Sequence, residues 1–123
     1  MHVMRPSYTA RMAAAHRAAH QELESGRVFR DPLAARILGE DAAAVIGDHL
    51  GGPAQTRQVR LYAAARSRIA EDALAAAVLT GIRQAVVLGA GLDTLGCRNP
   101  FEAQGLRVIE IDHPPRRNGN GSG

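Results

Sequence analysis

The residues best suited to chemistry lie in two neighbouring stretches near the end of the chain. Apolar residues 86–88 lead into the turn GAG, whose glycines are Gly89 and Gly91, and the later run LRVIEID ends in Asp112. A strand, a glycine turn, a second strand and an acid is the layout of a nucleotide-binding half-fold. If the two strands are parallel neighbours, the turn and Asp112 meet at the edge of the sheet where open α/β sheets bind ligands.

The spacing of the glycines narrows the class of ligand. A dinucleotide loop has a third glycine where this chain has Thr94, and Pro100 shortens any helix that follows, so a pyrophosphate would lose its usual anion site. No G-K-[ST] triplet occurs, which excludes a Walker loop. An adenosyl ligand without phosphate fits better, because the glycines allow close backbone approach and the acid can bind ribose hydroxyls. The pattern therefore favours S-adenosylmethionine over NAD.

Each of these features also has an ordinary structural interpretation. An apolar strand that ends in a glycine turn is common in α/β proteins of every kind. Asp112 taken alone could be a solvated strand end or a cap. The functional interpretation therefore depends on the combination and order of the features.

The preceding residues are predicted to form helices that support the two strands. The fold class is α/β, with an N-terminal helical region at 1–81, the start of an α/β unit at 82–114, and a tail at 115–123 whose composition predicts disorder. The expected helices cover residues 8–24, Asp31-Pro32 to Gly39, 41–49, and Pro53 to near Gly81. A break of the last helix at Ser67 is an alternative. The expected strands cover residues 84–88 and 106–111.

Composition excludes several classes of partner. All 15 basic residues are arginine and the formal net charge is +3, but acids are interleaved with them and no aromatic platform accompanies them, so we expect no nucleic-acid partner. The single Cys97 excludes an internal disulfide, and no run approaches the roughly 20 apolar residues of a membrane span. No apolar secretory segment follows the first residues, so the cytoplasm is the expected location and no membrane partner is expected.

Other reactive residue types are better explained by packing. His16 and His20 stand one helical turn apart and could share a metal ion. With no third ligand near them in the pattern, a surface or packing role is favoured and no metal is expected. Cys97 has no base partner in the pattern, and His113 is expected to be structural.

Six motifs, in order, resemble the leucine carboxyl methyltransferase family, in its bacterial branch of S-adenosylmethionine-dependent methyltransferases. The most specific pair is GAGLDT followed by EIDHP. The resemblance implies a class I, Rossmann-like methyltransferase fold with an added helical N-terminal region. It also implies S-adenosylmethionine as cofactor and methyl transfer to a carboxylate or hydroxyl of an unknown acceptor. The motifs are TARMAAAHRAAH near the start, VFRDPLA at 28–34, ARSRIAEDAL at 65–74, IRQAVVLGAGLDT at 82–94, RNPF at 98–101 and VIEIDHP at 108–114.

The resemblance carries roles to single residues. Gly89 and Gly91 match the glycines under the methionine part of the donor, and Asp112 matches the acid that binds the ribose hydroxyls. Arg66 matches an arginine that pairs with the donor's carboxylate, a role that suits the bidentate geometry of a guanidinium. Spacing alone does not separate Arg66 from Arg68.

Asp93 has two interpretations. It could position the donor's ammonium group, or its side chain could stabilise the turn. The next three residues, LGC at 95–97, depart from the aromatic or arginine residues often seen in the family, which puts contacts beyond Thr94 in doubt.

The resemblance ends at Pro114 or Pro115, whereas members of the family continue much further. We therefore expect a C-terminally truncated, donor-binding half that does not turn over by itself, with the helices better ordered than residues 84–123. The sheet would be incomplete, and its open edge predicts self-association. The rival hypothesis is a non-catalytic helical interaction module at 1–81 with a vestigial nucleotide-binding segment.

Overall fold

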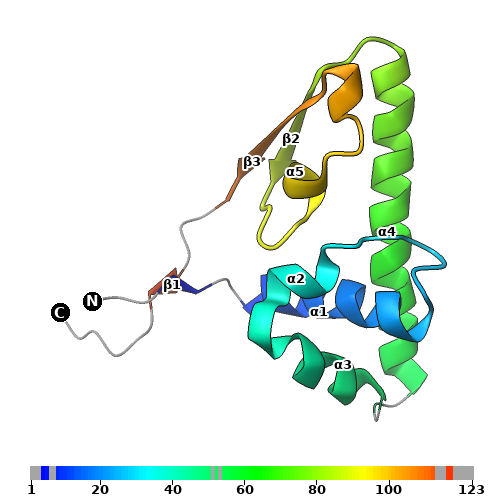
Figure 1. Cartoon of the computed structure of the whole chain (residues 1–123), viewed down its shortest axis with the longest axis vertical. Coiled ribbons are helices and arrows are strands. Elements are labelled where there is room, and N and C mark those ends of the chain that lie inside the picture. Colours follow the sequence, from blue (N-terminus) through cyan, green and yellow to red (C-terminus); the bar gives the residue numbers. More distant parts are fainter. Residues whose placement is uncertain (1–3, 6–7, 51, 53, 113–115, 118–123) are drawn as a thin grey trace.

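The computed structural model describes residues 4–5, 8–50, 52, 54–112 and 116–117. Helices come first, and two parallel strands with a short helix between them follow, as the sequence predicts (Figure 1). The elements are β1 (Met4–Arg5), α1 (Tyr8–Leu23), α2 (Ala34–Leu38), the 3₁₀ turn η1 (Gly39–Asp41), α3 (Ala42–Leu50), α4 (Ala54–Leu79), β2 (Gln84–Leu88), α5 (Leu95–Arg98), the 3₁₀ turn η2 (Glu102–Gln104), β3 (Arg107–Ile111) and β4 (Arg116–Arg117).

Helix α1 is the centre of the helical region and packs against α2, α3 and α4. Its buried face consists of small side chains, and Ala14, Ala18 and Ala19 are almost fully inaccessible to solvent. Alanines let neighbouring helices approach closely, but each buries little apolar area. Helix α4 extends from this cluster towards the sheet, so one element supports both parts of the chain (Figure 1).

The start of one helix and the predicted alternative of a break in another differ from the structure. Helix α2 begins at Ala34 rather than at Pro32, because Asp31 and Pro32 form a turn in which the Asp31 carboxylate accepts the N–H of Leu33 at 3.0 Å. The alternative of a break at Ser67 is wrong, since α4 runs without interruption from Ala54 to Leu79. The predicted stop at Gly39 is confirmed, with a φ of +67° that favours glycine.

Strands β2 and β3 form a parallel pair in the register Val86↔Ile109 and Leu88↔Ile111. One face of the pair is half-buried through Ala85, Val87 and Val108. The other face is open, with Leu88 75% exposed and Val86 54% exposed. Self-association through this two-stranded sheet stays a prediction.

A second, two-residue pairing joins the two ends of the chain. Met4 lies opposite Arg117 and Arg5 opposite Arg116, in antiparallel orientation. The sequence did not indicate this pairing. Apart from Arg116 and Arg117, the predicted tail lies outside the described residues. Among the residues that the structure describes, no helix combines the length and apolar composition needed to cross a membrane.

A buried ion pair fastens the end of α1 to α4. Arg60, only 4% exposed, donates from Nε to Glu24 Oε1 at 2.7 Å and from Nη2 to Oε2 at 2.5 Å. Glu24 Oε1 also lies 3.0 Å from His20 Nδ1. The hydrogen bonds from Arg60, and with them the one from His20, hold the pKa of Glu24 below its ordinary value despite the opposing effect of burial.

This lowered pKa gives the pair a defined pH dependence. Stability from a carboxylate with a depressed folded pKa is fully present above the unfolded pKa of about 4.3 and is lost as pH falls through the folded pKa. We expect Glu24→Gln to lower the free energy of unfolding by about 1.5–3 kcal/mol at pH 7. The gap to wild type should narrow as urea unfolding is repeated at acid pH. Glu22→Gln, at an exposed position of the same helix, is the control, and a gap that stays constant down to pH 3 contradicts the assignment.

Candidate functional site

A cavity of about 500 Å³ lies between α1, α4 and the turn after β2. That volume is within the usual range of small-molecule sites. All five residues predicted for the site line it: Arg66, Gly89, Gly91, Asp93 and Asp112. The fold therefore brings together residues that are up to 46 positions apart in the sequence, taking Arg66 and Asp112 as the extremes.

The glycine turn needs both of its glycines. Gly89 and Gly91 have φ values of +61° and +53°, in the left-handed region. The N–H of Gly89 donates to the carbonyl of Ile111 at 2.7 Å, which continues the sheet ladder into the turn. A Cβ on Gly91 would lie 2.7 Å from the Cβ of Ala10, whereas a Cβ on Gly89 would meet no atom within 4 Å. Gly91 is therefore also a point of close contact with α1.

Asp112 fixes this turn from the neighbouring strand. Its Oδ2 accepts the N–H of Gly91 at 2.7 Å, so the ends of β2 and β3 meet at one edge of the sheet, as the sequence predicts. A carboxylate has two oxygens and about four acceptor positions. The bond to Gly91 is therefore compatible with a second role for the same carboxylate towards a ligand in the cavity.

The structure separates the two candidate arginines of α4. Arg66 lines the cavity, and no hydrogen bond or ion pair of its side chain occurs among the described residues. Arg68 does not line it and instead pairs with Asp72 at 3.0 Å, with both side chains more than half exposed. Of these two arginines, it is therefore Arg66 whose side chain lies at the cavity.

Asp93 stabilises the loop and also lines the cavity. Its Oδ1 accepts the N–H of Leu95 at 2.9 Å, just before the four-residue helix α5. This hydrogen bond supports the interpretation that Asp93 stabilises the turn. The shortness of α5 agrees with the expectation that Pro100 leaves little helix after the loop, so the anion site that a pyrophosphate would need is missing from these residues.

Sequence reasoning missed Arg17. This α1 residue lines the cavity, and its Nη2 donates to the carbonyl of Leu92 at 2.6 Å. Burial lowers the pKa of Arg17, while Asp93 and Asp31 act in the opposite direction. A signal was present in the sequence: Ala10, Ala13 and Arg17 have the spacing of one helix face, and all three line the cavity.

Among the described residues, His16, His20 and Cys97 do not line this cavity. His20 is fully buried, and its Nε2 accepts the N–H groups of Val28 and Phe29 at 3.2 Å each. The packing role is therefore confirmed for His20, and the described residues contain no group of three or more side chains able to hold a metal. Cys97 is exposed. His113 lies outside the described residues.

Comparison with known proteins shows the family of the chain. Residues 10–117 match the leucine carboxyl methyltransferase family. The chain belongs to this family. No solved structure gives a significant match.

Similar proteins from three bacteria carry the name "Putative S-adenosyl-L-methionine-dependent methyltransferase". The protein of Parafrankia sp. (strain EAN1pec) is 39% identical over 92 residues, which is 72% of this chain and 29% of the relative. That of Mycobacterium avium (strain 104) is 38% identical over 116 residues, 86% of this chain and 36% of the relative. The protein of Streptomyces coelicolor is 34% identical over 110 residues, which is 86% of this chain and 38% of the relative. The chain thus spans about a third of the length of these relatives.

The two glycines offer a matched pair of substitutions. An alanine at either position must adopt a left-handed conformation, which costs about 1–2 kcal/mol. Gly91→Ala also places its methyl group against Ala10, so we expect the lower melting temperature for Gly91→Ala and a smaller decrease for Gly89→Ala. Differential scanning calorimetry of both variants measures the difference. Equal melting temperatures would mean that α1 does not restrain the turn.

Proposed function

We propose that the cavity binds S-adenosylmethionine and that the chain forms the donor-binding part of a class I, Rossmann-like methyltransferase. The observation that carries the proposal is one cavity that joins Arg66, a glycine turn and an acid bonded to that turn, and among the described residues the side chain of Arg66 has no hydrogen bond or ion pair. These groups match the carboxylate, the methionine backbone and the ribose of the donor in turn. Family membership and the names of the relatives support the same ligand.

The residues present fit this ligand chemically. Arg66 can bind a carboxylate through two parallel N–H groups. Gly89 and Gly91 present backbone without side chains, so a ligand can approach the turn closely. Asp112 can accept hydrogen bonds from vicinal hydroxyls, and Asp93, beside the turn, can face an ammonium group. S-adenosylmethionine supplies an activated methyl group whose transfer leaves a neutral thioether.

The chain's own contribution is mainly positioning. An in-line displacement at a methyl carbon needs donor and acceptor held at near-attack distance, and orientation of this kind can account for several kcal/mol of the barrier. A carboxylate acceptor is already ionised at neutral pH and needs no base, whereas a hydroxyl acceptor would need one. We therefore propose carboxyl or other O-methyl transfer for the whole protein, with the identity of the acceptor open.

The rival hypothesis of an independent helical module fits less well. Arg17 and Arg66 come from the helical region, and both line the same cavity as the glycine turn. In a helical module with a vestigial nucleotide-binding segment, nothing would require two arginines of the helices to line the cavity beside the glycine turn. The helical region and the strands are better understood as two walls of one site.

The ligand class can be tested by titration calorimetry with S-adenosylmethionine, S-adenosylhomocysteine and NAD. We expect both adenosyl ligands to bind more tightly than NAD, because the loop has no helix N-terminus of useful length for a pyrophosphate. Gly89→Ala should weaken binding of the adenosyl ligands, since its methyl group occupies space beside the turn. Tighter binding of NAD would reject the methyl donor as ligand.

The role of Arg66 is tested with a neighbouring control. Arg66→Ala should weaken binding of S-adenosylhomocysteine by about 1.5–3 kcal/mol, the scale of hydrogen bonds to a charged group. Adenosine, which has no carboxylate, should bind wild type and variant alike. Arg68→Ala removes an exposed arginine of the same helix and should leave both affinities unchanged. An equal loss for adenosine would show that Arg66 only supports the fold.

A further inference from the structure

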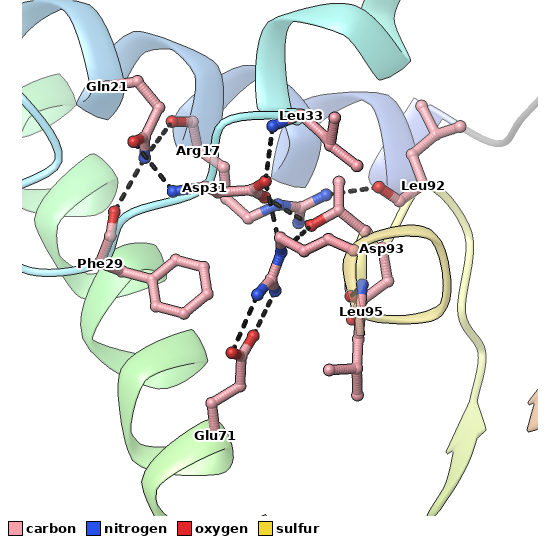
Figure 2. Close-up of polar contacts among 11 residues, drawn as sticks. Arg17, Gln21, Phe29, Asp31, Leu33, Glu71, Leu92, Asp93 and Leu95 are labelled. Atoms are coloured by element: carbon pink, nitrogen blue, oxygen red, sulfur yellow. Dashed lines mark hydrogen bonds and ion pairs between the residues drawn. The ribbon is translucent and has the colours of Figure 1, made fainter. Parts of the chain in front are cut away.

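The loop that follows the glycine turn is held by side chains of the helical region (Figure 2). Arg17 of α1 donates to the carbonyl of Leu92 at 2.6 Å. Two residues later, the hydroxyl of Thr94 donates to Asp31 Oδ2 at 2.6 Å. Asp93 lies between these two attachment points and lines the cavity. The direction of Asp93 is therefore set by contacts on either side of it.

Asp31 is itself fixed rigidly. It is 1% exposed, and its backbone N–H donates to Gln21 Oε1 at 3.0 Å. Its Oδ1 accepts the N–H of Leu33 at 3.0 Å, which leaves Oδ2 directed at Thr94. The carboxylate thus connects the segment before α2 with the loop after β2, across 63 positions of sequence.

Two buried arginines compensate the charge of Asp31. Arg98 Nε lies 3.5 Å from Oδ1 and also donates to the hydroxyl of Thr94 at 2.9 Å. Arg17 Nε lies 3.8 Å from Oδ2. Arg98 is held in turn by Glu71 of α4, to which its Nη1 donates at 3.0 Å. A buried carboxylate is costly unless it is paired and hydrogen-bonded, and here both conditions are met.

We propose that Asp31 is a positioning residue for the donor cavity, acting through the hydroxyl of Thr94. In this role Asp31 touches no ligand. It transmits the fixed geometry of the helical region to residues 92–94 and so keeps Asp93 and the glycine turn in the arrangement that forms the cavity wall. The effect on donor affinity rests on the function proposed above, whereas the effect on the loop does not.

A merely local role for Asp31 makes a different prediction. If Asp31 only organised the start of α2, its bond to the N–H of Leu33 would be sufficient and Thr94 would be incidental. Thr94→Val keeps the shape of the side chain and the Leu33 bond but removes the hydroxyl from a residue that is 1% exposed. Thr94→Ser restores the hydroxyl and is the matched rescue variant.

Amide hydrogen exchange of the full chain without ligand is the first measurement. Thr94→Val loses the hydrogen bond of the hydroxyl to Asp31 and the one that it accepts from Arg98. We therefore expect the amides of Leu92 to Leu95 to exchange about ten- to a hundredfold faster, the scale of hydrogen bonds to charged groups. Thr94→Ser should exchange like wild type, and the amides of β2 and α4 should be unaffected in both variants. Unchanged loop exchange in Thr94→Val, or the same acceleration throughout the chain, overturns the proposal.

Titration with S-adenosylhomocysteine is the second measurement. The affinity of Thr94→Val should be about three- to tenfold lower, because only the fraction of molecules with the loop in place can bind, and Thr94→Ser should recover it. If wild type itself does not bind, the proposed ligand is wrong, and the exchange data still decide whether Asp31 positions the loop. Loop exchange that accelerates while the affinity of Thr94→Val equals that of wild type rejects the positioning role.

Discussion

The arrangement of the molecule depends on the contacts of one buried group, the carboxylate of Asp31. It lies where the helical region meets the loop after β2, and it contacts Thr94, Leu33 and two arginines. A carboxylate in such a position cannot shift without losing several partners at once, and an unpaired buried charge is strongly unfavourable. Polar contacts therefore hold the two parts of the chain in one relative position. Apolar packing between alanine-rich helices alone would define that position less precisely.

The cavity follows from this attachment. One wall is made of faces of α1 and α4 that carry small side chains and two arginines, and the other is made of the ends of β2 and β3. Alanines such as Ala10, Ala13 and Ala63 leave room that larger side chains would fill. The close approach of Ala10 to Gly91 shows how tightly the walls meet beside the cavity. A site of this kind exists only while both walls are in place.

The sheet contrasts with this polar junction. Two strands have few contacts with which to resist fraying, and one face of the pair leaves Val86, Leu88, Ile109 and Ile111 between 39% and 75% exposed. The described residues thus combine a polar junction beside the cavity with an apolar sheet face open to solvent. The chain spans about a third of the length of its curated relatives.

The sequence by itself determined the local order of the elements and indicated five of the residues that line the cavity. Strand propensity, a glycine turn and an acid at fixed spacing are local signals. The turn requires positive φ values at residues 89 and 91, and glycine, which adopts such values readily, occupies both positions. Only the tertiary structure showed that Arg66 and not Arg68 lines the cavity and that Arg17 lines it too. It also showed that Asp31, which the pattern explains as a helix start, accepts a hydrogen bond from Thr94. These outcomes depend on the distance and rotation between α1, α4 and the loop. Helical spacing indicates which residues share a face, but it does not specify which other element that face meets, because that is settled by packing and by the pairing of buried charges.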